Sequence, residues 1–148
     1  MTNKNDSENS LQTSKARIPV WVNIFQVILT LIMLSQVFMY YFNHDAIRDA
    51  GISVDGVPML NLVYEMGART AVMAAAAIFV LITQDPKQFL VVLFMNVLRE
   101  GQEMVIDPLY PMLNAPASPV ADFVTHAVIV ALEILAFINV GMIVNKRK

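Results

Sequence analysis

Polar side chains stand at helical spacing inside three long apolar stretches of this chain. In residues 87–107, one set recurs at i, i+3, i+4, i+7 and i+11, which places it on one helix face: Asn96, Arg99, Glu100, Glu103 and Asp107. Residues 60–83 carry a second stripe, and residues 120–144 carry a third. The second stripe is Asn61, Glu65 and Arg69, and the third is Asp122, His126 and Glu133.

A charge at the middle of a membrane helix costs about 2.5–3.5 kcal/mol on insertion scales. We therefore expect the three stripes to face one another inside a helix bundle. A rise of about 1.5 Å per residue separates them into two layers. The outer layer, within roughly 5–10 Å of the outer surface, comprises Glu65, Glu103, Asp122 and His126. The deeper layer comprises Arg69, Arg99, Glu100 and Glu133.

These eight residues form a carboxylate-rich candidate site in the outer half of the bundle. Our leading interpretation is a cavity that binds a small ligand, an ion or a proton, because buried carboxylates and histidines line proton and ion pathways. Hydrogen bonds between helices are expected from the polar side chains of the first apolar stretch, which are Gln26, Thr30, Ser35 and Gln36.

A divalent metal is the one cofactor that these residue types suggest. Carboxylates and a histidine from several helices of a bundle can bind such an ion. The candidate ligands are Glu100, Glu103, Asp122 and His126. The Glu-x-x-His pair of di-metal bundles is absent, and the nearest spacings are common by chance, so the pattern does not identify a metal.

Two alternatives remain open. In the first, the chain is a membrane-embedded enzyme in which Glu103 and His126 act as acid and base, or as metal ligands, on a lipid or small apolar substrate. In the second, the chain is a structural subunit and its Arg–Glu pairs fix which helices pack together. An open cavity would favour a ligand site or an enzyme. Complete pairing of the charges without a cavity would favour the structural role.

The composition indicates a membrane protein. Of 148 residues, 57% are hydrophobic and 15% are charged, whereas soluble domains average about 45–50% and about 25%. The net charge of −2 gives no sign of nucleic-acid binding. The chain has no cysteine, which excludes disulfides and thiolate metal sites.

The elements expected to position the site are four membrane-spanning helices. They cover about residues 18–42, 60–83, 87–107 and 120–144, because about 20 apolar residues cross a bilayer. Asp85 and Pro86 suit the N-cap and first position of the third helix. The fold class is an all-α, integral membrane, antiparallel four-helix bundle occupying residues 18–144. Residues 1–17 are expected to be a disordered cytoplasmic tail, and residues 145–148 a basic cytoplasmic tail.

Basic residues set the expected orientation. Lys and Arg cluster in the two tails, whereas the loop after the first span has only Arg48 and the loop after the third has none. Both termini are therefore predicted to be cytoplasmic, in the cell's inner membrane. The lipid bilayer is the expected partner. The small residues Gly67, Ala71 and Ala75 could pack within one chain, against a second copy or against a partner in a membrane complex.

The layout resembles that of small bacterial inner-membrane proteins of the DoxX-like type. The resemblance covers residues 18–144 and rests on four short helices, a loop after the first, and Arg99-Glu100-Gly101 in the third helix before a proline-rich loop. It implies a four-helix bundle that sometimes serves as a subunit of a membrane redox complex. No functional residue is carried over from this resemblance.

Overall fold

The computed structural model describes residues 17–115 and 117–146, and this part of the chain is helical with no strand. The helices are α1 (Val20–Phe42), α2 (His44–Asp49), α3 (Val57–Thr83), α4 (Pro86–Leu109) and α5 (Pro119–Asn145). The all-α class is confirmed. Of the tail expected at 1–17, only Arg17 is described. Of the tail expected at 145–148, Asn145 instead ends α5, Lys146 follows it, and residues 147–148 lie outside the described part of the chain.

Local sequence signals explain where the long helices begin and end. Asp85 caps α4 as expected: its carboxylate accepts hydrogen bonds from the backbone N–H groups of Lys87 and Gln88 at 2.8 and 3.2 Å. Gln84 ends α3 in the left-handed conformation at φ 52°. Ser118 caps α5 by accepting from Ala121 N at 3.3 Å. The short α2 occupies the part of the first loop that precedes Gly51.

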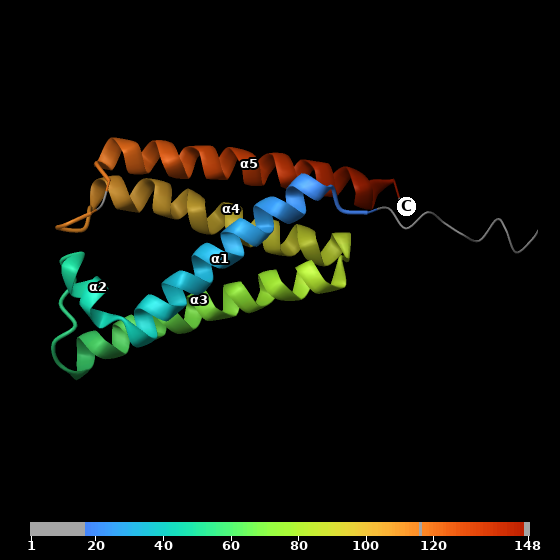
Figure 1. Ribbon diagram of the computed structural model, residues 1–148. Helices are drawn as coiled ribbons and strands as arrows, with labels where there is room; N and C mark the ends of the chain where they lie inside the picture. Colours follow the sequence, from blue (N-terminus) through green and yellow to red (C-terminus); the bar gives the residue numbers. More distant parts are fainter. Residues whose placement is uncertain (1–16, 116, 147–148) are drawn as a thin grey trace, which may run out of the picture.

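The four long helices form two antiparallel pairs, α1 with α3 and α4 with α5 (Figure 1). At one end, the turn end, α3 passes into α4, and α1 begins and α5 finishes there too. At the other end, the α2 end, the pairs spread apart around α2 and the loop between α4 and α5. Asn114 of that loop reaches back to the end of α2, where its side chain donates to Asp49 O at 2.9 Å. This hydrogen bond links the loop before α5 to α2 at that end of the molecule.

The apolar core lies toward the turn end. Its buried members include Val22 of α1, Ala77 of α3, Phe89 and Leu93 of α4, and Val140 of α5. A second, smaller cluster of Ile47, Val54 and Val63 fastens α2 and the first loop onto α3. The two clusters leave the middle of the α4–α5 pair to polar side chains.

Gly67 decides which face of α3 is buried. A Cβ atom there would lie 3.0 Å from both Tyr40 Cβ and Tyr41 Cε2 of α1, so a larger residue would require the neighbouring side chains to move by a few tenths of an ångström. The buried face of α3 is Val63, Gly67, Ala74, Ala77 and Val80. Ala75 is exposed, so the Gly67–Ala71–Ala75 row is not the line of contact within this chain, and its packing against a second copy or a partner stays a prediction.

The packing of α3 turns its polar stripe away from the bundle. Glu65 precedes Gly67 by two residues, which is about 200° of rotation on a helix. The side chains of Arg69 and Glu65 are 73% and 53% exposed, and they pair with each other at 3.4 Å. The expectation that all three stripes face one another is therefore wrong for α3, because small residues rather than charges set its contact face.

Three of the described helices, α1, α3 and α5, are long and apolar enough to cross a membrane. Large apolar side chains cover their outer surfaces, including Phe38 at 59%, Ile82 at 76% and Ile138 at 50% exposure. Such a surface suits lipid and not water, which supports a membrane protein with transmembrane helices. Helix α4 has 24 residues but a charged second half.

Candidate functional site

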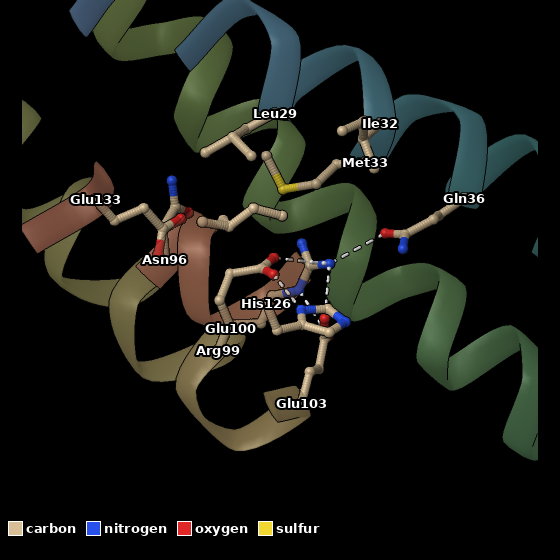
Figure 2. A pocket seen from close by; sticks show the side chains of 11 residues that line it. Leu29, Ile32, Met33, Gln36, Asn96, Arg99, Glu100, Glu103, His126 and Glu133 are labelled. Atoms are coloured by element: carbon tan, nitrogen blue, oxygen red, sulfur yellow. Dashed lines mark hydrogen bonds and ion pairs between the residues drawn. The ribbon is translucent and has the colours of Figure 1, made fainter. Parts of the chain in front are cut away.

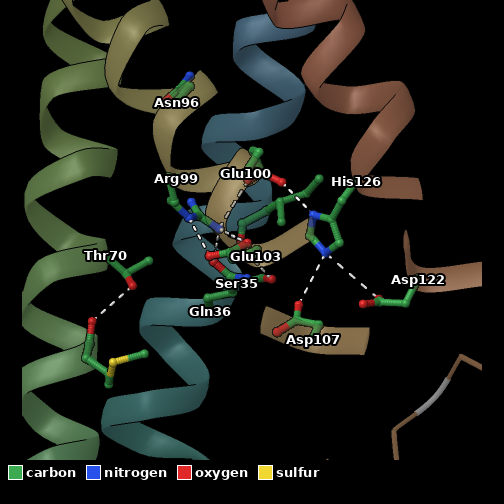
Figure 3. Close-up of polar contacts among 12 residues, drawn as sticks. Ser35, Gln36, Thr70, Asn96, Arg99, Glu100, Glu103, Asp107, Asp122 and His126 are labelled. Atoms are coloured by element: carbon green, nitrogen blue, oxygen red, sulfur yellow. Dashed lines mark hydrogen bonds and ion pairs between the residues drawn. The ribbon is translucent and has the colours of Figure 1, made fainter. Parts of the chain in front are cut away.

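Arg99 organises a network of polar groups between α1 and α4. Its Nε donates to Glu103 Oε1 at 2.9 Å, one turn along the same helix. Its Nη2 atom lies 3.5 Å from Glu100 Oε1 and donates a hydrogen bond to Gln36 Oε1 of α1 at 3.2 Å. One guanidinium thus holds two carboxylates and ties α4 to the other helix pair (Figure 3).

His126 of α5 has a different acidic partner on each side of its ring (Figure 3). Its Nδ1 lies 2.9 Å from Glu100 Oε2, where the ring donates a hydrogen bond to a carboxylate whose side chain is only 8% exposed. Its Nε2 lies 3.5 Å from Asp107 Oδ2 and 3.9 Å from Asp122 Oδ1. The imidazole therefore separates one buried carboxylate from two that are partly exposed.

Glu133 is the most unusual side chain of the site. It is 0% exposed, and it stands near the middle of α5, about 20 Å from either end. Neither carboxylate oxygen has a hydrogen-bond partner among the described residues. An unpaired buried carboxylate is costly, so a proton or a bound cation must balance its charge.

A cavity of about 80 Å³ joins these groups. Its polar wall is formed by Gln36, Asn96, Arg99, Glu100, Glu103, His126 and Glu133, and apolar side chains of α1 and α5 complete it. Figure 2 shows Glu133 beside Asn96 at one end of this central cavity and Glu103 at the other. Since one water occupies about 30 Å³ in the liquid, the central cavity has room for a few water molecules.

A second cavity of about 110 Å³ lies at the α2 end. We call it the mouth cavity. Asp107 and Asp122 are its charged lining residues, and the proline-rich loop between α4 and α5 supplies much of the rest. Because both aspartates face His126 Nε2, the imidazole stands between the mouth cavity and the central cavity.

The structure brings together six of the eight predicted site residues. Arg99, Glu100, Glu103, His126 and Glu133 line the central cavity, and Asp122 joins them through His126. Glu65 and Arg69 lie apart, on the exposed face of α3. The two expected layers also merge, because His126 of the outer layer contacts Glu100 of the deeper one.

Within residues 17–115 and 117–146, two sets of three side chains have potential metal-ligand atoms within 4.8 Å of one another: Glu100, Glu103 and His126, and Asp107, Asp122 and His126. In the first set, Arg99 already contacts both carboxylates. A divalent ion there would have to bind beside a fixed positive charge. The second set takes Asp107 in place of the predicted Glu100 and Glu103, so the four predicted ligands do not converge on one point.

Two neutral polar residues, Gln36 and Asn96, line the central cavity but are not among the eight predicted site residues. Asn96 lines the central cavity and donates to Gln26 Oε1 of α1 at 3.3 Å. Gln26 and Gln36 do bond across helices as expected, whereas Thr30 and Ser35 bond to carbonyl groups of their own helix. The helical spacing of α4 could have identified Asn96 and Asp107, because it places both on the same helix face as Arg99, Glu100 and Glu103.

Comparison with known protein families, with curated proteins and with solved structures finds no match for this chain.

Proposed function

We propose that this chain is a four-pass membrane protein whose central cavity binds a small cation or a proton. The observation that carries the proposal is Glu133, a fully buried carboxyl group with no hydrogen-bond partner among the described residues. A group of this kind inside a membrane helix is a functional-site hypothesis by default. In a purely structural network, the Glu133 carboxyl group would have a hydrogen-bond or ion-pair partner.

The charge balance of the central cavity supports a positive occupant. Three glutamates, Glu100, Glu103 and Glu133, face one arginine across the cavity. Arg99 pairs with Glu100 and Glu103, whereas among the described residues no hydrogen bond reaches either oxygen of Glu133. An anionic ligand would meet three carboxylates and an arginine that is already paired, whereas a cation or proton would find an unpaired carboxylate.

The size of the cavity supports a small occupant. Pockets that bury drug-sized molecules measure about 300–1,000 Å³, and the central cavity measures about 80 Å³. A lipid or an extended apolar substrate does not fit this volume. Of the two interpretations that require a cavity, small-ion binding is therefore favoured over an enzyme acting on lipid.

The proposed topology places α4 across the membrane with the other three long helices. Its apolar first half contributes Phe89, Val92 and Leu93 to the core, and its charged second half turns toward α1 and α5. With four crossings, Arg17, Lys87 and Lys146 lie on the same side of the membrane. The positive-inside rule assigns that side to the cytoplasm. The α2 end would then face outward from the inner membrane.

Membership of an inner-membrane complex, as the DoxX-like resemblance implies, remains part of the proposal. The Glu65–Arg69 pair supports it: this pair is exposed on α3 (side chains 53% and 73%), so a second copy or a partner helix would shield it from lipid.

Replacing both residues by glutamine should remove a copurifying partner seen by native mass spectrometry of protein released from its own membrane. Retention of every partner would contradict this role.

The test of cation or proton binding compares two glutamate-to-glutamine variants. Thermal unfolding of the purified full-length protein is measured at several pH values and with sodium, potassium, magnesium or manganese added. Ligand at about 100 times its Kd stabilises a folded protein by about 2.7 kcal/mol. We expect wild type to respond to pH or to one of these ions, Glu133→Gln to lose the response, and Glu65→Gln to retain it. Equal responses in all three proteins would refute the proposed cavity function.

A further inference from the structure

We propose that His126 passes protons from the mouth cavity to Glu133, so that the chain forms a proton half-channel open to the α2 end. This inference rests on the proposed function and identifies the cation as a proton. From the mouth cavity inward, neighbouring groups follow one another along the bundle. They are Asp107 and Asp122, then His126, then Glu100, and finally the central cavity with Glu133.

The two ring nitrogens of His126 face opposite compartments. Nε2 lies 3.5 Å from Asp107 Oδ2, on the wall of the mouth cavity. Nδ1 lies 2.9 Å from Glu100 Oε2, on the wall of the central cavity. Histidine is suited to this position because an imidazole can accept a proton on one nitrogen while it releases one from the other.

The proton transfer balances without another reactant. A proton from Asp107 or Asp122 bonds to Nε2 of the neutral ring, which becomes an imidazolium. The Nδ1–H bond then breaks and the proton passes to the Glu100 carboxylate. The ring is again neutral, in its other tautomer, and Glu100 carries the proton. A return of the ring to its first tautomer prepares it for the next transfer.

Water in the central cavity would carry the proton from Glu100 to Glu133. Among the described residues, Glu133 has no hydrogen-bond partner, so Glu100 cannot pass the proton to it directly. Glu100 and Glu133 both lie on the wall of the central cavity, which has room for a few waters. The Glu133 oxygens, to which no described residue donates a hydrogen bond, provide the end point of the path.

The path stops at Glu133. Toward the turn end, the buried side chains that follow on α5 are Ala136 and Val140, and those on α4 are Leu93, Val92 and Phe89. On α1 the buried polar side chain is Gln26, which bonds Asn96. None of these groups is titratable. The expected activity is therefore reversible loading of a proton at the middle of the bundle, without steady conduction through the isolated chain.

Other charged groups set the electrostatic surroundings of the path. Arg99 and Glu103 flank Glu100 on α4. Tyr40 is the titratable group that α1 brings near Arg99, Glu103 and Asp107. The Glu65–Arg69 pair of α3 points away from the cavity and provides a control.

The experiment measures charge displacement after a pH step, with full-length protein reconstituted in liposomes on a solid-supported membrane. We expect wild type to give a transient current and no steady current, because protons enter the bundle but do not cross it. Glu133→Gln should abolish the transient. His126→Asn and Glu100→Gln should slow it roughly a hundredfold, the lower end of what a positioned proton-transfer group contributes. His44→Asn and Glu65→Gln are matched controls that should behave as wild type.

The outcomes separate failure of the relay from failure of the cavity. If Glu133→Gln abolishes the transient while His126→Asn and Glu100→Gln match wild type, protons reach Glu133 by another route and the relay is refuted. If Glu133→Gln retains the transient, both the relay and the proposed cavity function are refuted. If a metal chelator removes the transient current, the site binds a metal ion and the proton relay is refuted. A steady current would contradict a half-channel that is closed at Glu133.

Discussion

Arg99 is the residue on which the charged wall of the cavity depends. It contacts Glu100 at 3.5 Å and Glu103 at 2.9 Å, and its own side chain is only 21% exposed. Its hydrogen bond to Gln36 extends the network to α1. Loss of the guanidinium would leave two carboxylates together without a cation, which is far more costly than loss of an exposed pair.

Replacement of Arg99 by leucine should therefore destabilise the protein. We expect the free energy of unfolding to fall by about 2–4 kcal/mol, slightly less than is typical of a fully buried pair because Arg99 keeps some exposure. Arg48→Leu is the control, since its partner Asp45 is 89% exposed, and we expect a loss below about 1 kcal/mol. Denaturant unfolding in detergent measures both. Equal losses would show that the Arg99 network does not stabilise the bundle.

At the scale of the helix, small residues determine how α3 packs. Gly67 lets α3 approach the aromatic side chains at the end of α1, and Ala74 and Ala77 continue the buried face. This contact fixes the rotation of α3, and the rotation turns Glu65 and Arg69 outward. The composition of the central cavity is therefore decided partly by a glycine that does not line it.

Alanine at position 67 tests this packing. A Cβ atom would press on Tyr40 and Tyr41 at 3.0 Å, and overpacking costs about 1–3 kcal/mol. The better helix propensity of alanine offsets at most about 1 kcal/mol. Gly141→Ala is the matched control, because its Cβ would lie 3.9 Å from Leu90 Cδ2. We expect a lower melting temperature for Gly67→Ala and no decrease for Gly141→Ala. A decrease in both would implicate helix glycines in general.

Hydrophobic patterning predicted the helices well, because length and polarity alone separate apolar spans from polar turns. The α4–α5 half of the site also followed from helical spacing, since both stripes face inward. Spacing could not predict the position of the α3 stripe, because helix rotation depends on close contacts such as that of Gly67 with Tyr41. Nor could it show that Glu133 has no hydrogen-bond partner in the described part of the chain while Glu100 has two partners.

At the scale of the whole molecule, the arrangement of two helix pairs predicts a specific topology. The turn end gathers Lys87 and Lys146, while α2 and the proline-rich loop occupy the opposite end (Figure 1). With four crossings, these ends lie on opposite sides of the membrane. The mouth cavity, Asp107 and Asp122 would then open to the outer side.

Single cysteines can establish this topology directly, because the chain has none of its own. A membrane-impermeant thiol reagent applied from outside should label Asp55→Cys and Ala115→Cys in intact cells. Lys87→Cys and Lys146→Cys should react only after the membrane is opened. Labelling of Lys87→Cys from outside would reverse the orientation. Reaction of Lys146→Cys and Ala115→Cys from the same side would contradict the crossing by α5.

Infrared spectroscopy of Glu133 tests the central claim most directly. The spectrum of Glu133→Gln is subtracted from that of wild type, in H₂O and in D₂O, at several pH values, with and without added cations. A carbonyl band of a protonated carboxyl group that shifts in D₂O, or a carboxylate band that moves when the cation is exchanged, is the predicted result. A carboxylate band that is unaffected by both pH and every added cation would contradict a cavity that balances this charge with a proton or a bound cation.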